Sequence, residues 1–458
     1  MTRGPIAPGI LALSWPLIVG NLLQTAYNLA DMYWVGRVSP EAVAAVSLMF
    51  PTSWMFISVA MGLTASTVAL VSQHIGAGND RTAEQVVAQS LLLSIGVSVT
   101  LGVVGYLARH PLLWALGAEG IVYREALAYA EVLFLSLPFT FIFFVFRSSL
   151  RGAGDTRTAM WLVVLSAGLN VVLDPVFILG WGPVEAMATQ GAAVATLIAR
   201  AVTAVVGLGV LLQGTRGIRL RLTDLQFDTT LMRQVVTIGY PATLDGLARS
   251  FAAVALAAVV ARFGPVVTAA YGIGLRLMSV SWTVSGAVGQ ATATGVGQNL
   301  GADRPGRAAS VTWWATAGTI ALLGGVSLVI LATPAWFMRL FIDDAAVIAE
   351  GVHMLHIVAP VWAFLGGLMV IQGAFRGAGR TRTSMALSVI SRYAVRFPIG
   401  LALAFPLTWG ITGMWVGLSI SGVIAFLIGV YWFRRGDWRQ SVIEHTPPAP
   451  PADRAVES

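Results

Sequence analysis

The sequence predicts an all-α polytopic membrane protein with twelve transmembrane helices in two pseudo-symmetric six-helix lobes. Three observations support this prediction. The 458 residues are 57% hydrophobic and only 11% charged, which is about half the charged fraction of soluble domains. Apolar runs near the ~20 residues that a helix needs to cross a bilayer recur along the whole chain. An eight-residue motif also occurs twice and divides the chain into two similar halves.

Twelve apolar runs supply the expected spans. Each is continuous and rich in Leu, Ala and Val, which is typical of helices that satisfy their own backbone hydrogen bonds in a bilayer and unlike the alternating strands of a barrel. The chain has no Cys, which excludes disulfides and thiolate metal sites. The expected spans cover residues 10–35, 48–73, 86–108, 125–147, 159–180, 188–212, 235–261, 270–297, 311–333, 351–373, 384–406 and 410–433.

Arginine positions predict the orientation of the spans, because cytoplasmic loops are enriched in basic residues. Eighteen arginines are assigned to the side that carries both termini, including Arg147, Arg151 and Arg376. The opposite side carries only five, which are Arg37, Arg109, Arg124, Arg262 and Arg339. We therefore expect a multi-pass protein of the cell membrane with both termini in the cytoplasm. The pI near 10.2 follows from these loops, so we expect a lipid bilayer and no nucleic acid as partner.

The repeated motif reads RGAGDTRT at 151–158 and RGAGRTRT at 376–383, so seven of eight positions match at an offset of 376 − 151 = 225 residues. Parallel duplication of a helical unit is a known transporter design. The same offset pairs Pro16 with Pro241, Gln73 with Gln298, and Gly76 with Gly301.

The repeat predicts the domain boundaries. We expect an N-lobe at 1–212 with a cation site, a cytoplasmic linker at 213–233 and a C-lobe at 234–440. The tail at 441–458 is Pro-rich and polar, so we expect it to be disordered in the cytoplasm.

The first span carries a polar stripe. Asn21, Gln24, Asn28 and Asp31 are spaced by three, four and three residues, which places them on one helical face. A carboxylate inside a membrane is costly, so by default it faces a cavity and marks a functional site. Asp31 is therefore the first candidate for ion coupling.

The fifth span supplies candidate partners for Asp31. Asn170 and Asp174 are four residues apart and share a face, and Pro175 frees a backbone carbonyl beside them. At the 225-residue offset, the second half replaces these three polar residues by apolar ones, which are Leu256, Val395 and Ile399. The acids therefore belong to the first half alone.

Three interpretations of these acids remain open. Two carboxylates, an amide and freed carbonyl oxygens suit Na⁺, whereas a carboxyl group in apolar surroundings prefers its neutral form and can carry a proton. The third interpretation is local, with Asp174 capping a kinked helix and Asp31 making a nearby hydrogen bond.

Four stretches carry a family resemblance: PLIVGNLLQTAYNLADMYWVG, VSQHIGAGN, LRGAGDTRTAM and NVVLDPVFILG. In this order they resemble the multidrug and toxic compound extrusion (MATE) family over all twelve spans, and most of all its DinF-like branch. The resemblance implies secondary active efflux with a cation site in the N-lobe. Its residues would be Asp31, Asn170, Asp174 and Thr196, with Tyr129 associated with them.

The second half departs from the NorM-like branch of that family, which has acids on its seventh and tenth helices. The tenth span here has no acid between His353 and Gly373, and Asp245 in the seventh stands four residues before Arg249. This spacing suits an ion pair, so a second Na⁺ site is not expected. Arg392 and Arg396 are further candidates to pair with Asp245 or to line a cavity.

We expect a monomeric antiporter that exchanges H⁺ or Na⁺ for organic cations or amphipathic drugs by alternating access, without a cofactor. Asn21, Gln24, Asn28, Asp245 and Arg249 are candidates for the substrate cavity. The alternative is a lipid-linked saccharide flippase of the same superfamily, which would use a cationic cavity. An intramembrane enzyme would need a nucleophile–base or metal constellation, and the sequence offers none.

Overall fold

The computed structural model describes residues 2–182, 184–214 and 217–443, and these residues form helices and connecting loops without a strand. Most of the predicted cytoplasmic tail lies outside the described residues. Eleven helical segments of the described chain are long and apolar enough to cross a membrane. Together with α9 (Pro265–Gly301) they account for the twelve expected spans.

The helix α9 falls outside the apolar set because its composition suits burial against protein rather than lipid. Every residue of its last three turns is buried, and they include Thr292, Thr294, Gln298 and Asn299. Small and polar residues of this kind allow membrane helices to approach closely and to bond to one another. The all-α membrane fold is thus confirmed.

Two sets of long helices follow one another along the chain. The first consists of α1 (Ile6–Gly36), α2 (Pro40–Gly76), α3 (Asp80–Leu107), α5 (Gly120–Ala153), α6 (Thr156–Leu179) and α7 (Ala188–Gln213). The second consists of α8 (Thr229–Ala261), α9, α10 (Pro305–Ala332), α12 (Ala345–Val358) with η2 (Ala359–Val361) and α13 (Trp362–Gly377), α14 (Thr381–Val389) with η3 (Ile390–Arg396) and α15 (Phe397–Ala404), and α16 (Ile411–Arg435).

The sequence did not indicate several local features. The short helices α4 (Arg109–Ala115) and α11 (Pro334–Arg339) and the turn η1 (Leu222–Asp224) lie between long helices. The tenth span is interrupted by η2, where Pro360 cannot donate a backbone hydrogen bond. The eleventh span contains a π-helical segment, η3, which carries both Arg392 and Arg396. Such π segments are rare and occur frequently at functional sites.

Side-chain caps and glycines fix several helix ends. Asp155 caps α6 by accepting the Thr158 N–H at 2.9 Å, and Asp228 caps α8 in the same way. Gly154, between α5 and α6 in the repeated motif, has a φ of 96° and ends α5 in a left-handed conformation that favours glycine. The RGAG motif is therefore a helix–turn–helix connection.

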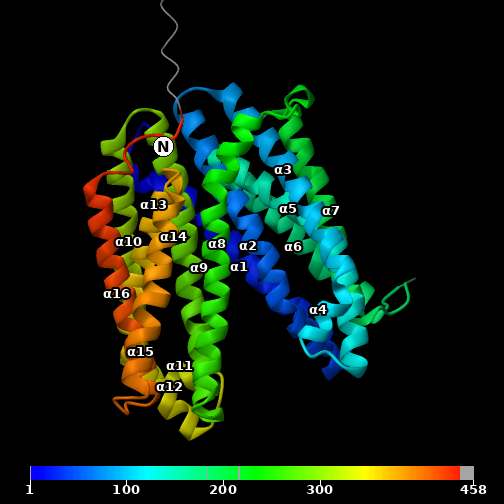
Figure 1. Ribbon diagram of the computed structural model, residues 1–458, viewed down its shortest axis with the longest axis vertical. Coiled ribbons are helices and arrows are strands. Elements are labelled where there is room, and N and C mark those ends of the chain that lie inside the picture. Colours follow the sequence, from blue (N-terminus) through cyan, green and yellow to red (C-terminus); the bar gives the residue numbers. More distant parts are fainter. Residues whose placement is uncertain (1, 183, 215–216, 444–458) are drawn as a thin grey trace, which may run out of the picture.

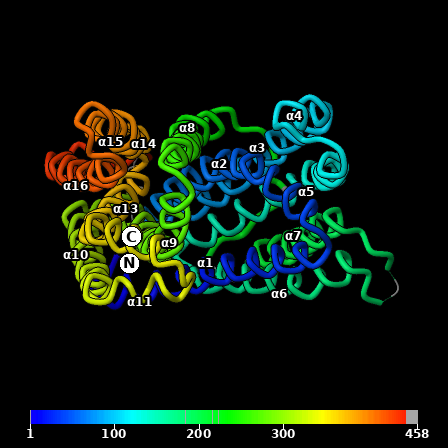
Figure 2. Tube along the Cα trace, turned by 90° about the horizontal axis from the view of Figure 1, so that it is seen from below, coloured from blue at the N-terminus to red at the C-terminus, as the bar shows by residue number. Residues whose placement is uncertain are grey.

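The helices form two groups that lie side by side, with α1 and α8 contacting both (Figures 1 and 2). The first half of α1 packs on the second group, where Ile10 meets Val311 and Leu13 meets Ala287. Its last turns pack on the first group, where Val35 lies with Ile178 of α6. Because α1 contacts both groups, a change at one of its ends can affect both.

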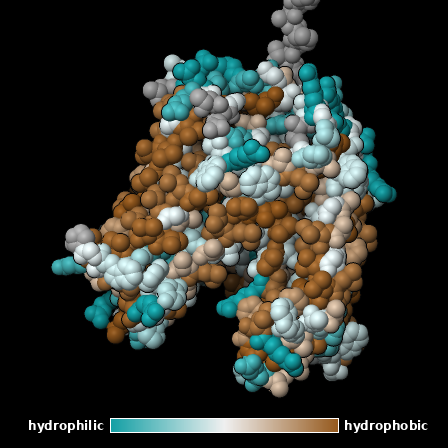
Figure 3. Space-filling view, turned by 180° about the vertical axis from the view of Figure 1, so that it is seen from behind, coloured by the Kyte–Doolittle hydropathy of each residue, from teal (hydrophilic) through white to brown (hydrophobic). Residues whose placement is uncertain are grey.

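A cleft separates the two groups at one end of the molecule and is absent at the other (Figure 3). Both described chain ends lie at the closed end (Figure 1). Hydrophobic surface covers the middle of both groups, and hydrophilic side chains gather at the two ends (Figure 3). This distribution is the one expected for a protein surrounded by lipid at mid-height.

Symmetric contacts made by α2 and α9 hold the two groups together at the closed end. Gln73 Nε2 donates to the Gly377 carbonyl at 3.0 Å, and Gln298 Nε2 donates to the Gly152 carbonyl at 3.2 Å. Both pairs are related by the same offset, since 298 − 73 and 377 − 152 equal 225. We call these two bonds, with the packing of Gly76 and Gly301 beside them, the glutamine exchange.

Candidate functional site

The predicted cation-site residues come from four helices of the first group. Asp31 lies near the end of α1, Tyr129 lies on α5, Asn170 and Asp174 lie on α6, and Thr196 lies on α7. The packing of α6 against both α1 and α7 brings these elements together. Asn170 Nδ2 donates to Thr196 Oγ1 at 3.1 Å, and the two carboxylates lie within electrostatic reach of each other and of Tyr129.

The oxygens of this cluster have an unusual shortage of donors. Asp174 is 0% exposed and Asn170 2%. Both carboxylate oxygens of Asp174, Oδ1 of Asp31 and Oδ1 of Asn170 are buried and have no hydrogen-bond donor among the described residues. Buried acceptors normally have a partner, and leaving one without any costs about 1–3 kcal/mol. A bound cation, or a proton on a carboxyl group, would satisfy these oxygens.

The contacts of Asp174 do not support the alternative interpretation in which it caps a kinked helix. The helix α6 continues past Pro175 to Leu179, and neither Asp174 oxygen caps it. Among the described residues, no group of three or more His, Cys, Asp or Glu side chains is placed to hold a metal. Two carboxylates with neutral amide and hydroxyl oxygens instead suit a monovalent ion or a proton.

The polar stripe of α1 divides into separate contacts. Asn21 Oδ1 accepts from Arg147 Nη2 at 2.8 Å, and Gln24 Nε2 donates to the Tyr27 hydroxyl at 2.5 Å. Asn28 is exposed. Asn21 and Gln24 therefore support neighbouring side chains, whereas Asp31 alone reaches the cation site.

Buried arginines lie further along the first group toward the closed end. Arg147, Arg151 and Arg200 are 8%, 5% and 6% exposed. Arg200 donates to the Tyr27 hydroxyl at 2.9 Å and stacks over Phe143. The helix α5 extends to Ala153 and carries both Arg147 and Arg151, which lie inside the protein at this end of the group rather than in a loop. No sequence pattern indicates this burial beyond the nearness of both residues to an apolar run.

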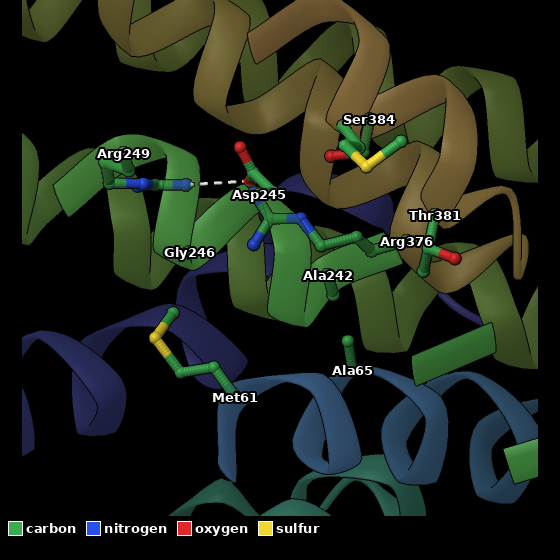
Figure 4. Close-up of a pocket in the computed structure, with 10 residues that line it drawn as sticks. Met61, Ala65, Ala242, Asp245, Gly246, Arg249, Arg376, Thr381 and Ser384 are labelled. Carbon is green, nitrogen blue, oxygen red and sulfur yellow. Dashed lines mark hydrogen bonds and ion pairs between the residues drawn. The ribbon is translucent and has the colours of Figure 1, made fainter. Parts of the chain in front are cut away.

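A second polar cluster lies between the groups (Figure 4). Arg249 Nη2 donates to Asp245 Oδ2 at 3.0 Å, which confirms the predicted ion pair. Arg392 Nη1 lies 3.6 Å from the other Asp245 oxygen, and Arg376 also approaches this carboxylate. Arg396 instead donates to Ser421 Oγ at 3.3 Å. The sequence pattern does not indicate that Arg376 joins this cluster, because its partner residues lie on other helices.

Two similar helical bundles beside a cleft, with charged side chains buried inside them, have the architecture of a membrane transporter. The MatE family model matches residues 16–176 and 241–402, and the chain belongs to this family. The matched segments begin 241 − 16 = 225 residues apart, the offset of the sequence repeat. The narrower assignment to the DinF-like branch stays a prediction.

Proteins of known name are similar to this chain over most of its length. A probable multidrug resistance protein, YoeA of Bacillus subtilis, is 27% identical over 93% of this chain and 93% of its own length. An FAD transporter of Shewanella oneidensis is 27% identical over 89% of this chain and 93% of its own.

Solved structures resemble the whole fold. A MOP superfamily transporter from Pyrococcus furiosus is 27% identical and superposes with a TM-score of 0.88, covering 95% of this chain and 96% of its own. A multidrug resistance MATE family transporter described as outward-facing is 28% identical, with a TM-score of 0.88 and the same coverage. These structures share with this chain the fold of MATE-family transporters.

Proposed function

We propose that this protein is a secondary active antiporter that exchanges H⁺ or Na⁺ for organic cations or amphipathic drugs. Asp31 and Asp174 are the coupling acids, and Asn170, Thr196 and Tyr129 complete their site. The observation that carries this proposal is the set of buried oxygens in this cluster without a donor. A group that alternately binds and releases a cation needs such oxygens.

Coupling requires that the cation bind one conformation more tightly than the other. The helix α1 offers the mechanical link, because its last turns carry Asp31 while its first half packs on the second group. Loading the acids changes the electrostatic repulsion between Asp31 on α1 and Asp174 on α6. The packing of α1 on α6 therefore differs between the loaded and unloaded states.

The two lobes, 1–212 and 234–440, are proposed as the bodies that move relative to each other, with 213–233 as their linker. In the cell membrane, with both termini in the cytoplasm, the cleft would open to the outside. The relative described as outward-facing supports this orientation. The protein would act as a monomer.

The test is dye efflux from proteoliposomes under separately imposed proton and Na⁺ gradients. Asp31→Asn and Asp174→Asn are each expected to abolish gradient-driven efflux while the protein still inserts. Asp343→Asn removes an exposed carboxylate and is expected to behave like the wild type. Normal efflux by Asp31→Asn would refute the assignment.

A lipid-linked saccharide flippase is the second candidate, and the arginines around Asp245 favour it. The same vesicles distinguish the two functions. A flippase would move no drug under either gradient and would reorient a labelled lipid-linked saccharide.

A further inference from the structure

The two copies of the RGAG motif place equivalent arginines in different surroundings. Arg151 and Arg376 are related by the 225-residue offset. Arg151 Nη1 donates to Gln290 Oε1. The position equivalent to Gln290 in the other half is 290 − 225 = 65, which is Ala65. Arg376 consequently has no glutamine to bond, although the backbone around it follows the same plan.

A pocket occupies the place of the missing glutamine side chain (Figure 4). It lies between α2 of the first group and α8, α13 and α14 of the second. Met61 and Ala65 line it from α2, while Asp245, Arg249, Arg376 and Ser384 line it from the second group.

The polar atoms of this pocket include donors that no protein acceptor uses. Ser384 is 3% exposed, and its Oγ has no hydrogen-bond partner among the described residues. The buried Nε of Arg376 has none either. In Figure 4 the Arg376 side chain extends along the pocket toward Asp245. Unused donors of this type select an acceptor from the ligand.

The charge in the pocket is also unbalanced. Asp245 is the one carboxylate that lines it, and its two oxygens already face Arg249 at 3.0 Å and Arg392 at 3.6 Å. The pocket lining therefore holds two arginines, Arg249 and Arg376, against one carboxylate, and Arg392 adds a third positive charge beside that carboxylate. A desolvated charge without a counter-ion is unfavourable. An anion held by Arg376 would reduce the imbalance.

We propose that this pocket binds the anionic group, a carboxylate or a phosphate, of the transported molecule, with Arg376 and Ser384 as its donors. The proposal rests on the proposed transport function and narrows the substrate class to amphipathic molecules that carry such a group. Met61 and Met385 supply adaptable apolar surface beside it. Because the lining comes from both groups, separating them at this level would dismantle the site and release the ligand.

The test is calorimetric binding of phenyl phosphate to the full chain in phosphatidylcholine nanodiscs. Arg376→Gln removes the donor, and Ala65→Gln restores the glutamine that occupies Arg151 in the other half. Each is expected to weaken binding about tenfold or more, the effect of losing one charged hydrogen bond. Arg434→Gln removes an exposed arginine outside the pocket and is expected to leave binding unchanged.

Equal phenyl phosphate affinity in the wild type, Arg376→Gln and Ala65→Gln would overturn the proposal, as would a wild type that binds tetraphenylphosphonium but no phenyl phosphate. Loss of binding when phosphatidylglycerol is added to the discs would identify a lipid phosphate as the occupant, and the anion site would stand. Asp31→Asn is expected to bind phenyl phosphate normally. Phenyl phosphate binding therefore tests the anion site separately, even if the efflux assay shows no cation coupling.

Discussion

Breaking the glutamine exchange is expected to open the closed end of the transporter. The variant Gln73→Ala removes the donor to the Gly377 carbonyl at 3.0 Å and the acceptor of the Val442 N–H at 2.9 Å. Gly377 is buried, so its carbonyl loses a partner that water cannot readily replace. One orphaned buried acceptor costs about 1–3 kcal/mol, which changes a two-state ratio about 5- to 150-fold.

The measurement is the distance between spin labels at Asp80→Cys and Gly306→Cys, which are exposed near the starts of α3 and α10. The chain has no Cys, so only these two positions would be labelled. Gln73→Ala is expected to transfer population from a short to a long distance. Gln298→Ala removes the reciprocal bond and is expected to shift the population in the same direction.

Gln213 provides a matched control for this experiment, because it is exposed at the end of α7. Gln213→Ala is expected to leave the distance distribution as in the wild type. An unchanged distribution in both Gln73→Ala and Gln298→Ala would show that the closed end does not depend on the exchange. A shift of equal size in Gln213→Ala would attribute the effect to general destabilisation.

Two further predictions concern the same region of the fold. Gly301→Ala would place a methyl group against the backbone carbonyl of Gln73, so it is expected to lower drug efflux more than Gly318→Ala, whose added methyl meets nothing within 4 Å. Asp155→Ala removes the cap of α6 and is expected to cost about 1 kcal/mol of stability, measured by thermal unfolding in detergent. Unaltered efflux in the first variant, or unaltered unfolding in the second, would contradict these expectations.

Hydrophobicity and spacing were enough to predict the spans and the repeat, because a membrane helix must be long and apolar and because duplication preserves residue offsets. The α9 span satisfied the length requirement while carrying many polar residues. Its burial against α2 explains that composition. The length and hydropathy of one helix do not reveal which other helices cover it. No sequence pattern predicts a π-helical segment such as η3 as reliably as hydrophobicity predicts a membrane span.

The site was predictable in part. Helical spacing placed Asn170 and Asp174 on one face, and family resemblance added Thr196, to which Asn170 is indeed bonded. Spacing identifies a face but not what the face contacts. The bond from Arg147 to Asn21 joins residues 126 positions apart, so no local pattern could reveal it. The proposed role of Arg376 depends on Ala65, which has no glutamine side chain to bond to it as Gln290 bonds to Arg151. This difference becomes apparent only when the two halves are compared in space.

The glutamine exchange has the form of an isologous contact, in which the same patch on two copies binds itself about a two-fold axis. A single six-helix chain would carry both the glutamine and the accepting glycine carbonyl, so two such chains could close against each other before any duplication. In a single fused chain the remaining positions are free to differ between the halves, as Asp31 and Leu256 do. Such a self-complementary dimer, joined into one chain, would carry two nearly identical RGAG loops, as this sequence does.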